Sequence, residues 1–140
     1  MKVVINNCFG GFGLSNLGEL EYLKLKGKNA FFYKQTKYKH NGGVDLYEKI
    51  SPDENEMFTH TLTKDMGDSF STFPDDKFYF SSREIERTDE DLIKVIESLG
   101  EKASGQCSSL KVIEIPDGVS WEIDEYDGLE SIHEVHRSWS

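Results

Sequence analysis

The chain has 140 residues, of which 36% are hydrophobic and 12% aromatic, so it is long enough to bury a core and is expected to form one domain over residues 1–140. Its formal net charge of −10 excludes a general attraction to DNA or to an anionic membrane surface, because both need a basic face. The sequence shows no leader-like and no membrane-spanning apolar run, and it has only two cysteines, Cys8 and Cys107. These features predict a reduced, cytoplasmic protein.

The first elements surround a glycine-rich turn. An apolar β-branched run at residues 3–5 predicts a buried strand that passes directly into this turn at residues 8–13. Ser15 is a suitable N-cap, and the leucines that follow predict an amphipathic helix that ends near Gly27. The run at residues 29–34 predicts a second strand, so the chain begins as a βαβ-like or α+β unit.

The middle of the chain is the hardest part to interpret. Residues 35–82 are polar and predicted to be irregular, as a lid or a variable insertion, with one alternating strand at residues 58–63. Residues 88–91 then supply a cap and an acidic first turn for a second helix. Its apolar stripe consists of Leu92, Val95, Ile96 and Leu99.

The last third predicts a hairpin and a helix. Residues 110–115 and 119–123 alternate as two strands around a Pro-Asp-Gly turn, which suggests that they pair. The tail has apolar residues at spacings of 3, 3 and 4, which favours a short C-terminal helix. These residues are Leu129, Ile132, Val135 and Trp139. The predicted fold class is therefore α+β, a single compact domain with a mixed or antiparallel sheet, two main helices and a short C-terminal helix.

The glycine-rich turn at residues 10–13 matches neither common nucleotide motif. A dinucleotide fingerprint needs a third glycine where Asn16 stands, and a Walker motif needs a Gly-Lys-Ser/Thr that is absent. A strand, a turn rich in backbone N–H groups and a helix start still suit an anionic ligand. The alternative is a tight structural turn packed under Phe9 and Phe12.

Arginine is scarce, and two of the three arginines, Arg83 and Arg87, lie four residues apart just before a helix cap. Arginine suits bidentate binding of phosphate. The alternative is that these two side chains pair with Glu84, Glu86 or the acidic first turn of the helix.

Catalytic and metal sites are not predicted. His133 and His136 lack the spacing of a His-Glu-x-x-His zinc site, and no nearby Cys or Asp completes a ligand set. No nucleophile elbow is present, and no sequence feature pairs two carboxylates for acid–base chemistry. We therefore expect a binding protein that needs no metal and no cofactor, rather than an enzyme.

Three blocks of the chain together resemble a widespread family of small tailed-phage proteins, leaving residues 28–78 uncovered. That family is similar to anti-CBASS sponge proteins, which form homo-oligomers and sequester cyclic dinucleotide signals of bacterial immunity without cleaving them. The blocks are residues 5–15, residues 83–89, and an ending made of residues 115–119, 125–128 and 136–139.

The resemblance implies a phage immune-evasion protein that binds cyclic dinucleotides such as cyclic GMP-AMP, assembled as a dimer or tetramer in the host cytoplasm. From chemistry, the glycines would approach the ligand through their backbone, the arginines would neutralise phosphates, aromatic rings would stack on bases and asparagines would read base edges. The predicted site residues are Asn6, Asn7, Phe9, Gly10, Gly11, Phe12, Gly13, Arg83, Arg87 and Tyr126.

Two other classes of function stay open. An acidic inhibitor could bind a host defence or regulatory protein, in which case nucleotides would not shift its melting temperature. A small nucleotide hydrolase would return a product rather than intact ligand after incubation and denaturation.

Overall fold

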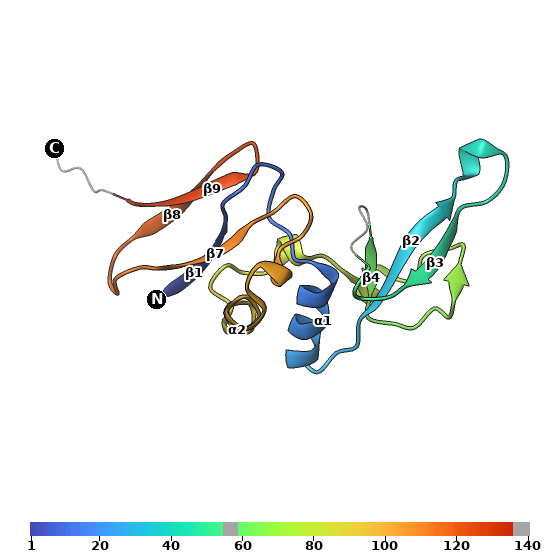
Figure 1. Cartoon of the computed structure of the whole chain (residues 1–140), viewed down its shortest axis with the longest axis horizontal. Helices are drawn as coiled ribbons and strands as arrows, with labels where there is room; N and C mark the ends of the chain where they lie inside the picture. Colours follow the sequence, from blue (N-terminus) through green and yellow to red (C-terminus); the bar gives the residue numbers. More distant parts are fainter. Residues whose placement is uncertain (55–58, 136–140) are drawn as a thin grey trace.

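The structure is a computed structural model that describes residues 1–54 and 59–135 (Figure 1). Its described part contains the α-helices α1 (Asn16–Leu25) and α2 (Glu90–Leu99), and the 3-10 helices η1 (Lys39–Asn41), η2 (Asp76–Phe78), η3 (Ser82–Glu84) and η4 (Gly100–Ala103). The strands are β1 (Lys2–Asn6), β2 (Phe31–Lys37), β3 (Leu46–Ile50), β4 (His60–Leu62), β5 (Ser69–Phe70), β6 (Tyr79–Phe80), β7 (Leu110–Glu114), β8 (Trp121–Tyr126) and β9 (Leu129–Glu134).

All of the strand pairs are antiparallel in the described chain. β1 pairs with β7, β8 pairs with β9, and the other five strands form a sheet in the order β5-β3-β2-β4-β6. In Figure 1, β1, β7, β8, β9 and α2 lie on one side of α1, and β2, β3 and β4 lie on the other. The predicted α+β class with two main helices is confirmed.

The main hydrophobic core lies between α1, α2 and β1. The apolar stripe of α2 packs here, because its spacing places every member on one face of the helix. Val4 and Leu92 are fully buried in this cluster. Its buried members are Val4, Phe12, Leu14, Tyr22, Leu23, Ile85, Leu92, Ile93, Val95, Ile96 and Ala103.

A second, separate core lies in the β2–β6 sheet. It consists of Tyr33, Tyr47, Leu62 and Phe70, with Phe31 and Met66 packed against it. The ring of Tyr33 meets Phe70 edge-on, and Tyr47 stacks on Phe70. In its described part, the segment 35–82, predicted to be irregular, contains four complete strands, β3, β4, β5 and β6, and β4 lies within the strand predicted at 58–63.

The helix boundaries follow the predicted caps. The hydroxyl of Ser15 accepts a hydrogen bond of 3.1 Å from the Gly18 amide, and Gly27, at φ +75°, follows the last turn of α1. The side chain of Asp89 caps α2, and Gly100 ends it. However, β1 and β2, which flank α1, belong to different sheets, so the predicted βαβ-like beginning is not formed.

The predicted C-terminal helix is wrong, because Leu129–Glu134 form β9. Asp127 and Gly128 both have positive φ, 49° and 87°, which is the backbone of a two-residue hairpin turn. This turn folds the tail back onto β8, where Ile132 lies opposite Ile123. Trp139 and His136 lie outside the described residues.

The predicted pairing of residues 110–115 with 119–123 is also wrong. Both segments are strands, but β7 pairs with β1, and β8 pairs with β9. The apolar run in β1 lies beside β7 in this sheet, with Val4 opposite Val112. Within the described residues, neither α-helix combines the length and the apolar character needed to cross a bilayer.

Candidate functional site

The glycine-rich turn is held by two neighbouring segments that it approaches very closely. Gly10 has φ +123°, and a Cβ there would stand 2.6 Å from the carbonyl oxygen of Cys107. A Cβ on Gly128 would stand 2.2 Å from the amide nitrogen of Gly11. Only glycine fits at positions 10 and 128, so part of the glycine pattern serves packing between the turn, the 105–108 loop and the β8–β9 turn.

The same turn also has room at Gly13 and, within the described chain, backbone amides without a protein acceptor. A Cβ on Gly13 would meet nothing within 4 Å. Among the residues that the structure describes, the backbone amides of Gly11, Phe12 and Gly13 donate to no protein acceptor. The carbonyl of Gly13 accepts bonds from the Gly105 amide and the Ser108 hydroxyl, at 3.0 and 2.6 Å. These bonds fix the turn as a wall with unpaired N–H groups.

A hollow of about 420 Å³ lies against this wall, between the turn, α1, Thr59 and the 105–108 loop. Its volume is in the range of small-molecule sites. The wall residues that line it run from Gly10 to Asn16, and Glu19, Thr59 and Arg83 complete its rim and floor. Of this lining, the predicted site included residues 10–13 and Arg83 but not residues 14–16, Glu19, Thr59 or the 105–108 loop.

A second hollow of about 480 Å³ shares Gly10, Gly11, Phe12 and Arg83 with the first. Arg83 is exposed and contributes to both hollows. In the described part of the chain, no ion pair or hydrogen bond holds its guanidinium. The structure therefore leaves one cation available at the junction of the two hollows.

Arg87 is engaged differently. Its guanidinium pairs with both carboxylate oxygens of Glu130, one of them at 2.9 Å, and lies over the ring of Phe12 at 3.6 Å from the ring centroid. The backbone amide of Asn6 donates a hydrogen bond to the same carboxylate. The pairing is with β9, not with Glu84, Glu86 or the first turn of α2, and it reduces the capacity of Arg87 to bind phosphate.

Asn6 is also used inside the protein. It is fully buried, its side-chain amide donates to the carbonyls of Cys8 and Gly128 at 2.8 Å, and its side-chain oxygen accepts from the Ser109 amide. These bonds tie β1 to the two turns beside it. Asn7 is exposed, and only its backbone amide, which donates to the Ser109 carbonyl, has a recorded partner in the described chain.

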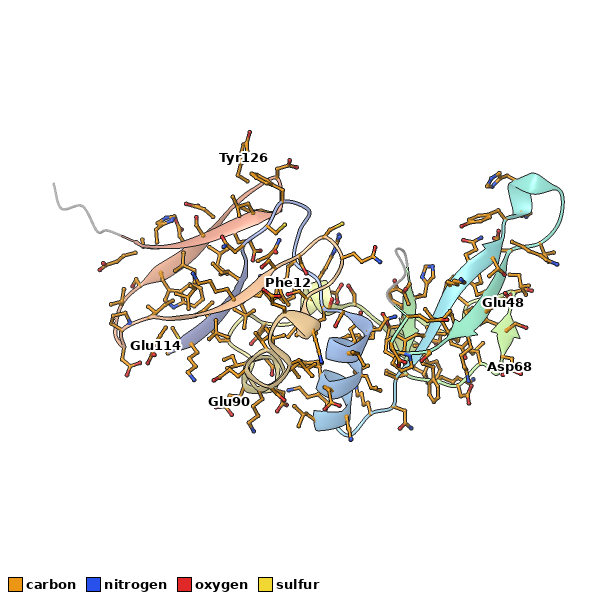
Figure 2. All side chains as sticks on the ribbon, in the orientation of Figure 1. Phe12, Glu48, Asp68, Glu90, Glu114 and Tyr126 are labelled. Carbon is orange, nitrogen blue, oxygen red and sulfur yellow. The ribbon has the colours of Figure 1, made fainter. Side chains whose placement is uncertain are left out.

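The predicted aromatic residues divide into one that is buried and two that are exposed. Phe12 is buried under Arg87, whereas Phe9 and Tyr126 are 57% and 77% exposed. The two exposed rings meet edge-to-face with centroids 6.5 Å apart. Figure 2 shows Tyr126 projecting outward from the turn between β8 and β9, with Phe12 in the interior. Phe9 and Tyr126 are thus the rings free to stack on another molecule.

Glu19 is a buried carboxyl at the floor of the first hollow. Desolvation raises its pKa to about 7, although a hydrogen bond with Thr61 acts in the opposite direction. One of its oxygens, Oε2, is buried without a hydrogen-bond partner in the described residues. Sequence reasoning missed it because a glutamate in an amphipathic helix is ordinarily on the solvated face.

His133 lies between two carboxylates on one face of the β8–β9 hairpin. Its Nε2 is 2.6 Å from Glu122 and its Nδ1 is 2.7 Å from Asp124, and all three side chains are exposed. Each ring nitrogen faces a different carboxylate, and the three side chains bring one ligand atom each within 4.8 Å of one another. The sequence predicts no nearby Asp beside His133, because Asp124 lies on the neighbouring strand and not in the same segment.

Comparisons with protein-family models, with curated proteins and with solved structures find no significant match. The interpretation of the two hollows therefore depends on their own geometry and chemistry.

Proposed function

We propose that this chain binds and sequesters cyclic dinucleotides such as cyclic GMP-AMP without cleaving them, as a phage immune-evasion protein in the host bacterial cytoplasm. The observation that carries the proposal is the pair of hollows that meet at Arg83. A cyclic dinucleotide has two bases around a ring with two phosphates. One base in each hollow and a phosphate at the guanidinium would match this arrangement.

The backbone supports the same orientation. The amide of Gly13, a position with open space beside it, offers a hydrogen-bond donor to a phosphate oxygen without adding a formal charge. Local donors of this kind are needed, because the net charge of −10 opposes anion binding over the surface as a whole. The carboxylates of Glu125 and Asp127 at the second hollow would suit the amino groups of bases rather than phosphates.

A homo-oligomer would complete the site. Both hollows are open to solvent, and a ligand that polar is better held when it is enclosed. Phe9 and Tyr126 are exposed and are adjacent in the chain to Gly10, Glu125 and Asp127, which line the second hollow, so they could cover a base or contact another subunit. We therefore include assembly as a dimer or tetramer in the proposal.

The proposal is tested by calorimetry with a panel of cyclic di- and trinucleotides at 150 mM salt. We expect a Kd of ~nM for a preferred cyclic dinucleotide, equivalent to about −12 kcal/mol. Arg83→Ala should weaken binding at least tenfold, whereas Lys94→Ala, which removes one charge from α2 away from both hollows, should not. A panel with no binder contradicts the proposal, and unchanged affinity in Arg83→Ala contradicts the placement of the phosphate.

Glu19 gives a specific reason to test hydrolysis as the second candidate function. A carboxyl whose pKa is near 7 is suited to general acid–base catalysis. Chromatography of the ligand after incubation and denaturation separates the two functions: sequestration returns intact ligand, and hydrolysis returns product that Glu19→Gln no longer forms. If the chain instead captures a host protein and binds no nucleotide, the function is that of a protein-binding inhibitor.

A further inference from the structure

A separate hollow lies on the β2–β6 sheet, away from the glycine-rich turn. It has a volume of about 380 Å³. Thr59 lines the first hollow, whereas the next residue, His60, lines this one. The lining residues are His60, Leu62, Phe73, Pro74, Asp76 and Tyr79. We call this group the His60 pocket.

Three rings of the His60 pocket are mutually inclined, so they form a cup rather than a stack. The centroids of His60 and Phe73 are 5.2 Å apart, those of His60 and Tyr79 are 6.2 Å apart, and those of Phe73 and Tyr79 are 6.4 Å apart. The angles between the ring planes are 64°, 57° and 78°. Phe73 and Tyr79 are the rings of this cup that attract a cation placed over their faces within about 6 Å of the ring centroid.

The rings are unusually exposed for aromatic side chains. Phe73 is 39% exposed and Tyr79 is 48% exposed, although both belong to a continuous aromatic cluster with Tyr47 and Phe70. Nearby lysines do not fill the cup. In the described chain, Lys64 and Lys77 lie over the ring of Phe78 instead.

The polar groups of the pocket accept hydrogen bonds. Asp76 contributes a carboxylate. Nδ1 of His60 is buried and has no hydrogen-bond partner in the described residues. Burial lowers the pKa of His60, so the ring is neutral near pH 7, and with the proton on Nε2 its Nδ1 is an acceptor. An unpaired buried acceptor, a carboxylate and the rings of Phe73 and Tyr79 suit a ligand that is a cation and a hydrogen-bond donor.

We propose that the His60 pocket binds a primary alkylammonium group, with the charge over the rings of Phe73 and Tyr79 and its N–H groups directed to Asp76 and to Nδ1 of His60. A quaternary ammonium satisfies the rings but not the two acceptors, so it should bind less tightly. The same chemistry occurs in polyamines and in lysine side chains. The net charge of −10 favours either source.

The test is titration of the full chain at pH 7.5 and 150 mM salt, followed by NMR, with butylammonium, tetramethylammonium and neutral butanol as probes. We expect saturable binding at millimolar concentrations in the order butylammonium, tetramethylammonium, butanol. Tyr79→Leu should weaken butylammonium binding at least fivefold, and Tyr79→Phe, which keeps the ring, should not. Spermidine and N-acetyl-lysine methylamide, compared in the same titration, distinguish the polyamine source from the side-chain source.

Two matched variants separate the pocket from general effects of charge and folding. Asp76→Asn should weaken butylammonium severalfold, whereas Asp75→Asn, which removes a neighbouring charge and still leaves a capping side chain for η2, should not. Phe78→Leu removes an adjacent ring outside the pocket and should leave the affinity unchanged. Butanol binding as tight as butylammonium, or equal losses in Asp75→Asn and Asp76→Asn, would overturn the proposal. All variants are compared after thermal melts show that they fold.

Discussion

At the scale of single residues, the most consequential side chain is Glu19, because its burial couples stability to pH. Its pKa is about 7 in the folded protein, against 4.5 for a glutamate that is fully solvated. A raised folded pKa means that the folded state holds the proton more tightly than the unfolded state. The resulting stability is complete below pH 4.5 and is lost as the pH rises through 7. The loss amounts to about 3 kcal/mol.

Glu19→Gln removes this dependence. We expect the variant to match the wild type near pH 4.5 and to have a free energy of unfolding up to about 3 kcal/mol higher at pH 8. Urea unfolding at several pH values measures the difference. Glu21→Gln, two residues along the same helix, is the control and should follow the wild-type profile. Parallel profiles for the wild type and Glu19→Gln would contradict a buried, desolvated carboxyl.

Sequence-based prediction of the site succeeded for residues whose role follows from local backbone conformation. It failed for residues whose role depends on a partner far away in the sequence. The cap at Ser15 and the glycine-rich turn depend on local conformation, so they could be predicted from the sequence. The internal roles of Arg87 and Asn6 depend on β9 and on the two neighbouring turns, which local patterns do not place. Burial of Glu19 depends on a β4 residue packed against α1.

At the scale of elements, the β8–β9 hairpin is joined to the rest of the fold through a buried ion pair. Glu130 is buried, and its carboxylate forms an ion pair with Arg87 and accepts a hydrogen bond from the backbone amide of Asn6. Removing one partner of such a pair leaves a buried charge uncompensated. This pair acts together with the hydrogen bonds from Asn6 to Gly128 and from Gly10 to Asp127, which also hold the hairpin over the glycine-rich turn.

Arg87→Ala should therefore lower the free energy of unfolding by about 3 kcal/mol, as measured by urea titration. Adding Glu130→Gln to Arg87→Ala should recover part of the loss, because the uncompensated charge is then absent. Lys2→Ala breaks the exposed pair with Glu97 and is the control, with an expected effect below about 1 kcal/mol. Equal effects of Arg87→Ala and Lys2→Ala would show that the Arg87 pair is solvated.

Element prediction was most accurate for the helices. Both have strong caps, and α2 has a continuous apolar stripe. The tail was assigned to a helix because its apolar spacing also fits one, whereas the Asp127–Gly128 turn imposes a hairpin. Pairing of β7 with β1 joins residues more than 100 positions apart. The sequence predicts pairing of β7 with β8 because a turn separates these two neighbouring strands, and local patterns do not show so distant a partner.

At the scale of the whole molecule, the fold has two hydrophobic clusters that share no residue. One includes α1 and α2, and the other is the aromatic core of the β2–β6 sheet. The sequence predicts one α+β domain, and its composition supports a sizeable core. It does not predict this division, because the second core is built from single aromatic and aliphatic residues on short strands rather than from a periodic run.

The division predicts that the two clusters lose protection separately. Leu62 and Leu92 are both fully buried, one in each cluster, so replacing either with alanine creates a cavity that costs about 2–5 kcal/mol. Leu62→Ala should increase amide hydrogen exchange in β2, β3 and β4 while α2 stays protected, and Leu92→Ala should have its largest effect in α2 and β1. The lining of the first hollow draws on both parts of the fold, with Phe12 and Leu14 from the first cluster and Thr59, the residue before β4. Either substitution should therefore also weaken a ligand bound there. Uniform loss of protection along the chain in both variants would instead mean that the clusters unfold as one cooperative unit.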